Sequence, residues 1–378
     1  MKFDEIRKAE ARYYSGVFSR FPVAVEKGRG MYVWDTDGRK YLDMFSGIAV
    51  NSVGHCHPKV VDAIKKQAET LIHVSNWYYT VPQVQLAEKL AKLTGQEKVF
   101  LTNDGTSAVE TAIKLARKAK GKPGIIAMEN AFHGRTLGSL SLTWGEKYKT
   151  PFKPLLDDVK FVPYNDASKV EEAITDKTAA VIVEPIQGEA GVLMPDKGYL
   201  KELRQVASDN DVLLIVDEVQ TGFGRTGVMF AHQRDGIKPD ILCLSKAMGS
   251  GLPIGAAVYS GFDFEPGEHG GTLIGNPVTC AAALATIDVI EKEKLVENSK
   301  KMGDAIVKRL NENGVDCRGA GLMIGVPVKD GRKVVSSLIG ESVLAVYSKD
   351  TLRLLPPLII NDGHVDEFMK AFKKVMEW

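Results

Sequence analysis

The middle of the chain alternates short, uninterrupted apolar runs with longer segments of helical periodicity. Helical periodicity extends over Gly105–Lys118, Ala167–Ile174 and Tyr199–Ser208. Because the apolar runs are continuous, both faces of each predicted strand should be covered, as in a parallel sheet with crossover helices. The predicted strands are Val99–Thr102, Ile125–Met128, Val159–Val162, Ala179–Val183, Val212–Val216, Ile241–Leu244 and Gly255–Tyr259.

The two ends of the chain follow a different pattern. Residues 31–45 are typical of a hairpin with Asp37-Gly38 at its tight turn, and a long helix is expected from Pro277 to about Glu293. After that helix, the pattern predicts helix, strand, helix, strand and helix. We therefore expect a large α/β domain over 46–293 and a smaller α+β domain formed by 1–45 with 294–378.

Composition narrows the class of protein without naming a function. The 378 residues include 49 basic and 48 acidic side chains, so no general field attracts nucleic acid or an anionic membrane. No run of about 18 uncharged apolar residues is present, which argues against a spanning helix. The charged start of the chain lacks an apolar secretion core, and four separated cysteines predict free thiols. These features favour a cytoplasmic location.

Lys246 is the first candidate for chemistry. It ends the apolar run Asp240–Lys246 and precedes a loop rich in glycine and proline. Most isolated lysines are surface charges. Burial, however, lowers a lysine pKa by up to about 3–5 units and makes the amine a nucleophile towards carbonyl carbon.

Two further segments could bind a charged ligand. Asp217 ends the strand Val212–Val216 and needs a cationic partner, for which a protonated pyridine nitrogen and an arginine are equally suitable. Asn103–Glu110 opens a helix after the first strand, and Gly105 there would let a phosphate approach the free amides. The alternative is an ordinary helix start capped by Thr106 or Ser107.

Four side chains in other loops are candidates for substrate contacts. Phe132 could stack on a flat ring, and Arg135 could bind a carboxylate through two hydrogen bonds. Arg353 lies inside an apolar run and needs a partner, which could be a structural acid or a substrate carboxylate. Glu189 lies in a loop with glycines after the strand Ala179–Val183.

Two motifs are interpreted as structural. Gly222–Gly227 matches a dinucleotide-binding pattern, but it comes late in the sheet and no helix follows it, so we predict a turn. His55-Cys56-His57 lacks a third ligand at metal-binding spacing. Pro58 follows directly, so a helix start at 58 is expected and no metal site is predicted.

Taken together, these segments resemble the class III aminotransferases, which are fold type I enzymes dependent on pyridoxal 5′-phosphate (PLP). The resemblance covers nearly the whole chain and implies a mostly parallel seven-stranded sheet covered by helices, plus a smaller α+β domain from both termini. Within the family, Phe45–Val50 and Ser75-Asn76 are most similar to acetylornithine aminotransferases. The other matching segments are Gly54–Pro58, Gly105-Thr106, Phe132–Arg135, Glu184–Glu189, Asp217–Gln220, Gly222–Gly227, Lys246 and Gly275–Pro277.

The resemblance implies a role for each candidate. Lys246 would hold the cofactor and move a proton, Asp217 would pair with the pyridinium nitrogen, and Phe132 would lie on the ring. Arg135 would bind a substrate carboxylate, while Arg353 would bind the α-carboxylate of glutamate or 2-oxoglutarate and otherwise pair with Glu189. The remaining cofactor contacts would come from Gly105, Thr106, Glu218, Val219, Gln220 and, from a second subunit, Thr272.

Some positions depart from the family pattern. Asp104 stands where a serine is usual, and an acid beside a phosphate should point away or pair with a cation. Gly271 stands where a substrate-contacting Ser or Thr is usual, and Leu273-Ile274 replace an aromatic-glycine pair. Tyr79 lies near a tyrosine position of ornithine aminotransferases. These departures leave the expected cofactor site intact, but they leave the identity of the substrate open.

The expected reaction transfers the terminal amine of N²-acetylornithine to 2-oxoglutarate in a homodimer with shared active sites. Acetyl-lysine, or lysine on an amino-group carrier protein, are related donors. The alternatives are an ornithine or 4-aminobutyrate ω-aminotransferase and, from another reaction class, a glutamate-1-semialdehyde aminomutase.

Overall fold

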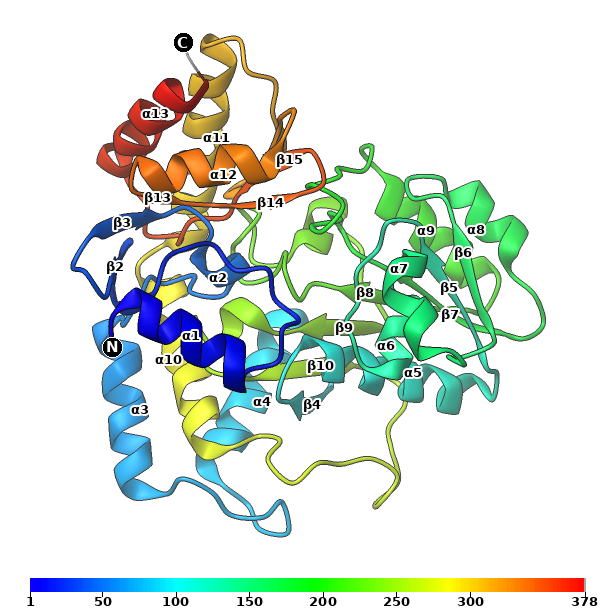
Figure 1. Cartoon of the computed structure of the whole chain (residues 1–378). Coiled ribbons are helices and arrows are strands. Elements are labelled where there is room, and N and C mark those ends of the chain that lie inside the picture. Colours follow the sequence, from blue (N-terminus) through cyan, green and yellow to red (C-terminus); the bar gives the residue numbers. More distant parts are fainter. Residues whose placement is uncertain (377–378) are drawn as a thin grey trace.

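The computed structural model describes residues 1–376, and its centre is a seven-stranded sheet in the order β4-β10-β9-β8-β7-β5-β6 (Figure 1). β10 is antiparallel to both of its neighbours, whereas the remaining neighbours pair in parallel. The predicted mostly parallel sheet is confirmed. Its strands are β4 (Lys98–Thr102), β5 (Gly124–Met128), β6 (Val159–Val162), β7 (Thr178–Val183), β8 (Leu213–Asp217), β9 (Ile241–Leu244) and β10 (Gly255–Tyr259).

The continuous apolar runs arise because both faces of this sheet are covered. In β8, Leu213 and Ile215 pack in one core with α5 (Gly105–Lys120). Leu214 and Val216 point the other way, into a second core that includes α8 (Ala167–Ala173) and α9 (Tyr199–Asp209). Successive residues of a strand point to opposite faces, so a strand buried on both sides needs apolar residues at every position.

Several helices surround the sheet. α3 (Pro58–Thr70) begins at Pro58, as predicted, and packs with α4 (Val81–Thr94) against α10 (Pro277–Lys292). None of the helices in residues 1–376 is long and apolar enough to cross a membrane. The other helices are α1 (Phe3–Tyr13), α2 (Ser46–Ala49), α6 (Leu137–Leu142), α7 (Glu146–Lys149), α11 (Leu295–Glu312), α12 (Gly331–Gly340) and α13 (Asp362–Met376), and 3-10 turns span Thr150–Phe152, Ala231–Asp235 and Lys246–Met248.

Two small four-stranded sheets are formed by the ends of the chain. The predicted hairpin is confirmed as β2 (Tyr32–Asp35) and β3 (Lys40–Asp43), with Gly38 at φ 84° in the turn. β3 also pairs in parallel with β13 (Val343–Leu344), so the two ends of the chain share a sheet. Beyond these, the structure has β1 (Val25–Arg29), β11 (Arg318–Ala320), β12 (Met323–Pro327), β14 (Val346–Ser348) and β15 (Thr351–Leu354).

The C-terminal part has more strands than the sequence predicted. We expected one strand on either side of α12, and the structure has β11 and β12 before it and three short strands after it. This prediction was wrong because strands of two or three residues, such as Arg318–Ala320, are too short for a hydrophobic period to appear.

The direction of the strands brings the candidate segments together. β4, β5, β7, β8 and β9 run the same way, since β4 and β9 are both antiparallel to β10. Their carboxyl ends therefore meet at one edge of the sheet, where ligands bind in open α/β folds. The segments that begin at Asn103, Ala131, Glu184, Asp217 and Ser245 all start at or near that edge.

The two motifs interpreted as structural have structural contacts. Gly222–Gly227 forms consecutive turns, as predicted, and Arg225 inside it is fully buried. The Arg225 guanidinium donates to the carbonyls of Leu322 and Pro356, so the turn joins the large sheet to the C-terminal region. His55 Nε2 lies 2.6 Å from Oδ2 of Asp43.

Candidate active site

A single cavity at this edge contains most of the predicted site residues. It has a volume of about 560 Å³. We call it the Lys246 cavity. Of the predicted cofactor and substrate residues, it is lined by Gly105, Thr106, Phe132, Arg135, Glu189, Asp217, Val219, Gln220 and Lys246.

Lys246 lies two residues after the end of β9, and its backbone is in the left-handed region at φ 42°. That conformation costs a non-glycine residue about 1–3 kcal/mol and is typical of functional positions. Burial lowers the pKa of Lys246, and the nearby Glu189 carboxylate opposes part of that shift. The amine is therefore easier to deprotonate than a surface lysine, as a nucleophile towards carbonyl carbon must be.

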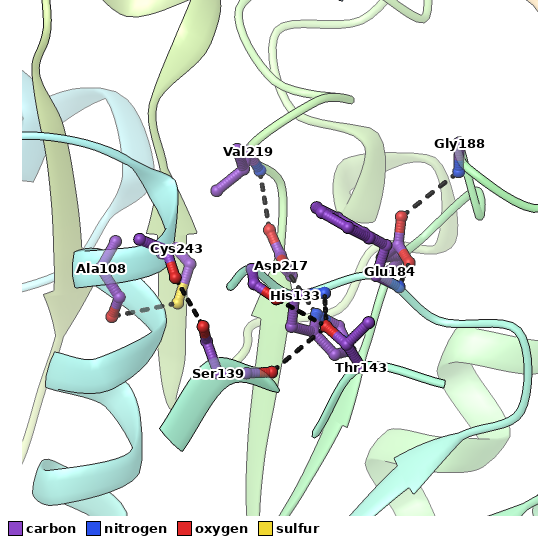
Figure 2. A network of polar contacts seen from close by, with 12 residues as sticks. Ala108, His133, Ser139, Thr143, Glu184, Gly188, Asp217, Val219 and Cys243 are labelled. Atoms are coloured by element: carbon purple, nitrogen blue, oxygen red, sulfur yellow. Dashed lines mark hydrogen bonds and ion pairs between the residues drawn. The ribbon is translucent and has the colours of Figure 1, made fainter. Parts of the chain in front are cut away.

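Asp217 ends β8, and its carboxylate is held from two sides (Figure 2). Oδ1 accepts the Val219 amide at 3.0 Å, and Oδ2 lies 2.7 Å from Nδ1 of His133. Both side chains are buried, so the carboxylate has one fixed orientation. His133 in turn is placed by its own amide, which donates to the hydroxyl of Thr143 at 2.9 Å.

Glu184 follows β7 and joins two loops of the site. One of its oxygens accepts the amide of Phe132 at 2.8 Å. The other accepts the amide of Gly188 at 3.2 Å, as Figure 2 shows. Burial raises the pKa of Glu184 to about 7, with His133 opposing and Asp217 reinforcing the shift. The loop that contains Phe132 is thus tied to the loop that leads to Glu189.

The start of α5 provides a place for an anion. The first amides of a helix have no partner within the helix, and its dipole favours negative charge there. Asp104 caps the helix by accepting the Ser107 amide at 2.7 Å, which corrects the expectation that Thr106 or Ser107 is the cap. The Gly105 and Thr106 amides at the cavity wall stay available to an anion. Asp104 is held by the helix amide rather than by a cation.

Arg353 lies in β15, behind the wall of the cavity, and is 1% exposed. Its guanidinium donates to Oε1 of Glu189 at 2.7 Å and to Oε1 of Gln220 at 2.9 Å. Burial alone would raise the pKa of Glu189, but Arg353 and Lys246 hold it below its ordinary value. Without substrate, the partner of Arg353 is therefore an acid of the protein.

Arg135 is an exposed cation at the cavity, held by aromatic rings. Its guanidinium carbon lies 4.1 Å from the centre of the Tyr148 ring and 5.3 Å from that of Phe132. Cation–π contacts of this kind orient a guanidinium while leaving its N–H groups free for a carboxylate.

Other predicted residues lie outside the Lys246 cavity. Glu218 is fully buried on the far side of β8, where it pairs with Nδ1 of His232 at 2.7 Å, so its side chain is structural. Thr272 and Gly271 lie in the connection after β10 and line a separate cavity of about 670 Å³. Tyr79 is 98% exposed.

Two residues that hold parts of the candidate site in place were missed from the sequence. His133 and Glu184 belong to segments that were singled out, but neither was assigned a role. The available signal was a charged residue at the end of a fully apolar strand for Glu184, and a histidine directly after an aromatic residue for His133. Both residues act through other side chains in the fold, which the order of residues along the chain does not reveal.

Comparison with known proteins agrees with this geometry. The family model for aminotransferase class III matches residues 13–376. Acetylornithine aminotransferase of Methanosarcina acetivorans is 48% identical over 381 residues, which covers 99% of this chain and 96% of that protein.

Two solved structures show the same fold. Ornithine aminotransferase from Toxoplasma gondii, which has PLP at partial occupancy in its active site, has a TM-score of 0.95 at 33% identity, covering 100% of this chain and 95% of that one. Acetylornithine aminotransferase from Elizabethkingia anophelis has a TM-score of 0.88 at 32% identity, with both chains covered fully. The chain therefore belongs to the class III aminotransferases.

Proposed function

We propose that this protein binds PLP at Lys246 and transfers the terminal amine of N²-acetylornithine to 2-oxoglutarate, giving N-acetylglutamate 5-semialdehyde and glutamate. The observation on which the cofactor proposal chiefly depends is the convergence of Lys246, Asp217 and the first turn of α5 in one cavity. The donor proposal is supported by the 48% identity with an acetylornithine aminotransferase over nearly the whole chain.

The residues of the cavity fit PLP in chemical type. The free amides of Gly105 and Thr106 suit its phosphate, and the Asp217 carboxylate suits a protonated ring nitrogen. A Cβ on Gly105 would lie 2.6 Å from a methyl group of Val219, so glycine at this position lets the start of α5 pack directly against Val219 at the cavity wall. The Lys246 amine suits the aldehyde. When bound, PLP supplies an electron sink for the carbanion formed at the reacting carbon.

The chain's own residues perform the remaining tasks. Lys246 would take the proton from the amine-bearing carbon of the donor in the first half-reaction and deliver a proton to the carbon that becomes the amine-bearing carbon of glutamate in the second, and a lysine of lowered pKa is more readily available as the free amine that accepts the proton. Asp217, fixed by His133 and Val219, keeps a positive charge on the ring nitrogen. Arg135 binds the donor carboxylate at the cavity mouth.

Arg353 and Glu189 let one pocket take two dissimilar substrates. When acetylornithine presents its terminal amine, no carboxylate is near the reacting carbon, and Glu189 neutralises the buried Arg353 at 2.7 Å. When glutamate or 2-oxoglutarate binds, its α-carboxylate replaces Glu189. An arginine buried this deeply requires an anion in both half-reactions.

A donor panel tests the proposal. Acetylornithine, acetyl-lysine, ornithine and 4-aminobutyrate should each be assayed with 2-oxoglutarate, and acetylornithine should give the highest kcat/KM. A higher value for acetyl-lysine would reassign the donor within the same mechanism. Preference for ornithine or 4-aminobutyrate would contradict the donor assignment.

We also propose a homodimer in which Thr272 binds the cofactor phosphate of the other subunit. Its support is that Thr272 lies outside the Lys246 cavity, in an exposed region where Trp77 is 90% exposed and Tyr79 98% exposed. Mixing Lys246→Ala subunits with Thr272→Val subunits tests this. Each mixed dimer would contain one intact site, so activity should return on mixing; no recovery, with mixed dimers present, would contradict shared sites.

A further inference from the structure

Thr272 lies in the connection between β10 and α10, which contains no helix or strand. The connection spans residues 260–276 and includes glycines at 261, 267, 270, 271 and 275. In Figure 1 it is the yellow-green loop that extends from the body of the molecule. Glycine-rich backbone has many accessible conformations, so side-chain contacts must determine where Thr272 lies.

His269, three residues before Thr272, contacts the large sheet. Its ring stacks on Phe100 of β4, with ring centres 4.6 Å apart and an angle of 27° between the planes. The ring of Phe264, from the same loop, lies 4.9 Å away on a tilted plane. His269 is therefore held in one place and orientation.

Hydrogen bonds to α5 define the protonation state of His269. The Lys114 ammonium, which only donates, lies 3.0 Å from Nδ1, so Nδ1 is an acceptor and the ring hydrogen is on Nε2. Nε2 then donates to the hydroxyl of Thr111 at 3.0 Å, and that hydroxyl donates to the carbonyl of Ser107 at 2.8 Å. This series of hydrogen bonds ends at Ser107, in the first turn of α5.

The charges around His269 agree with a neutral ring. Burial and Lys114 lower the pKa of His269, and Glu110 of α5 opposes them. Glu268, the loop residue next to it, pairs with Lys118, and its carbonyl accepts from Lys114 at 2.8 Å. A protonated ring would lose the Lys114 contact, because Nδ1 would then be a donor.

A second contact holds the other side of Thr272. The side-chain Nδ2 of Asn76 donates to the carbonyl of Ile274 at 3.1 Å, and the side-chain Oδ1 of Asn76 accepts from Nε2 of Gln83 at 2.6 Å. Thr272 thus lies between two anchored points, with His269 on one side and Asn76 on the other.

We propose that His269 is a positioning residue, which holds Thr272 where it reaches the cofactor phosphate of the partner subunit. The chain from His269 through Thr111 to Ser107 attaches this loop to the helix whose first turn binds the protein's own cofactor phosphate. This inference rests on the proposed function and its homodimer, and it adds a role for residues outside the Lys246 cavity.

The test is a double-mutant cycle read out as the PLP dissociation constant of the full-length dimer, measured by equilibrium dialysis. Thr111→Val removes the hydroxyl with little change in volume, and Thr111→Ser is the matched control that keeps it. We expect His269→Leu and Thr111→Val to raise the dissociation constant about tenfold, which corresponds to ~1.4 kcal/mol, and Thr111→Ser to change it less than about twofold.

The cycle identifies the route of the effect. In a Thr272→Val background, Thr111→Val and His269→Leu should cause no further loss, because they act through Thr272. Equal losses in both backgrounds, or no loss in either, would overturn the inference. Borohydride trapping of PLP on Lys246 in the unmodified protein separates this from the proposed function, which fails if no cofactor is trapped there.

Discussion

His133 Nδ1 lies 2.7 Å from Oδ2 of Asp217, and both side chains are buried at the carboxyl end of the central sheet. An ionised carboxylate only accepts hydrogen bonds, so the hydrogen between them belongs to His133. With the Val219 amide on Oδ1, the bond fixes the direction in which Asp217 faces the Lys246 cavity.

Removing the His133 contact should reduce catalysis without removing the cofactor. A hydrogen bond to a charged group contributes about 1.5–3 kcal/mol, so His133→Leu should lower kcat/KM roughly ten- to a hundredfold. His133→Asn keeps an N–H near the position of Nδ1 and should lose less. Steady-state kinetics checks this, together with the visible absorption of bound cofactor. An unchanged kcat/KM in His133→Leu would contradict the positioning role.

Glu184 should make folding stability depend on pH. Its pKa is raised from 4.5 to about 7 in the folded protein, so the folded state retains a proton that the unfolded chain releases. The associated stability is fully present below pH 4.5 and is lost as the pH rises towards about 7. Urea midpoints across this window should fall with pH. Glu184→Gln, which is neutral throughout, should show a shallower fall; an identical slope would contradict this assignment.

Glu189→Ala should change the preference of the site between glutamate and acetylornithine. It leaves the guanidinium of Arg353, 1% exposed, without its acid partner and therefore selective for an anion. We expect KM for glutamate to decrease and kcat/KM for acetylornithine to fall about tenfold or more. Kinetics of the two half-reactions, measured separately, would show a gain for glutamate and a loss for acetylornithine. A parallel loss in both would show that Glu189 is structural.

Arg135→Ala should weaken binding of the amine donor and leave cofactor binding unchanged. Its guanidinium lies 4.1 Å from the Tyr148 ring centre and contacts the cavity mouth, so cofactor binding should persist while KM for acetylornithine rises about tenfold or more. Tyr148→Phe keeps the ring beneath the guanidinium and should leave KM nearly unchanged. Cofactor titration and donor kinetics check both. Loss of cofactor in Arg135→Ala would assign this residue to the phosphate instead.

The large sheet and the nucleophile were predictable from the sequence for a physical reason. Strands buried on both faces need apolar residues at every position, so the runs at Ala179–Val183 and Ile241–Leu244 stood out. Lys246 and Asp217 were found because they are charged residues at the ends of such runs. Parallel strands then bring those ends to one edge of the sheet.

The missed features depend on contacts between distant segments. The pairing of His133 with Asp217 joins residues 84 positions apart, and no local pattern encodes it. The cap of α5 was assigned to Thr106 or Ser107, because Asp104 was considered for its effect on a phosphate and not as the residue that accepts the Ser107 amide. The side chain of Glu218 lies away from the cavity because successive residues after β8 point in different directions.

The most direct test of the account is chemical trapping at Lys246. The purified protein should be saturated with PLP, reduced with borohydride, digested and analysed by peptide mass spectrometry. We predict that the cofactor is found on the peptide that contains Lys246, and that Lys246→Ala abolishes both this product and amine transfer. Absence of the product, or its appearance on another lysine with activity retained in Lys246→Ala, would contradict the central claim.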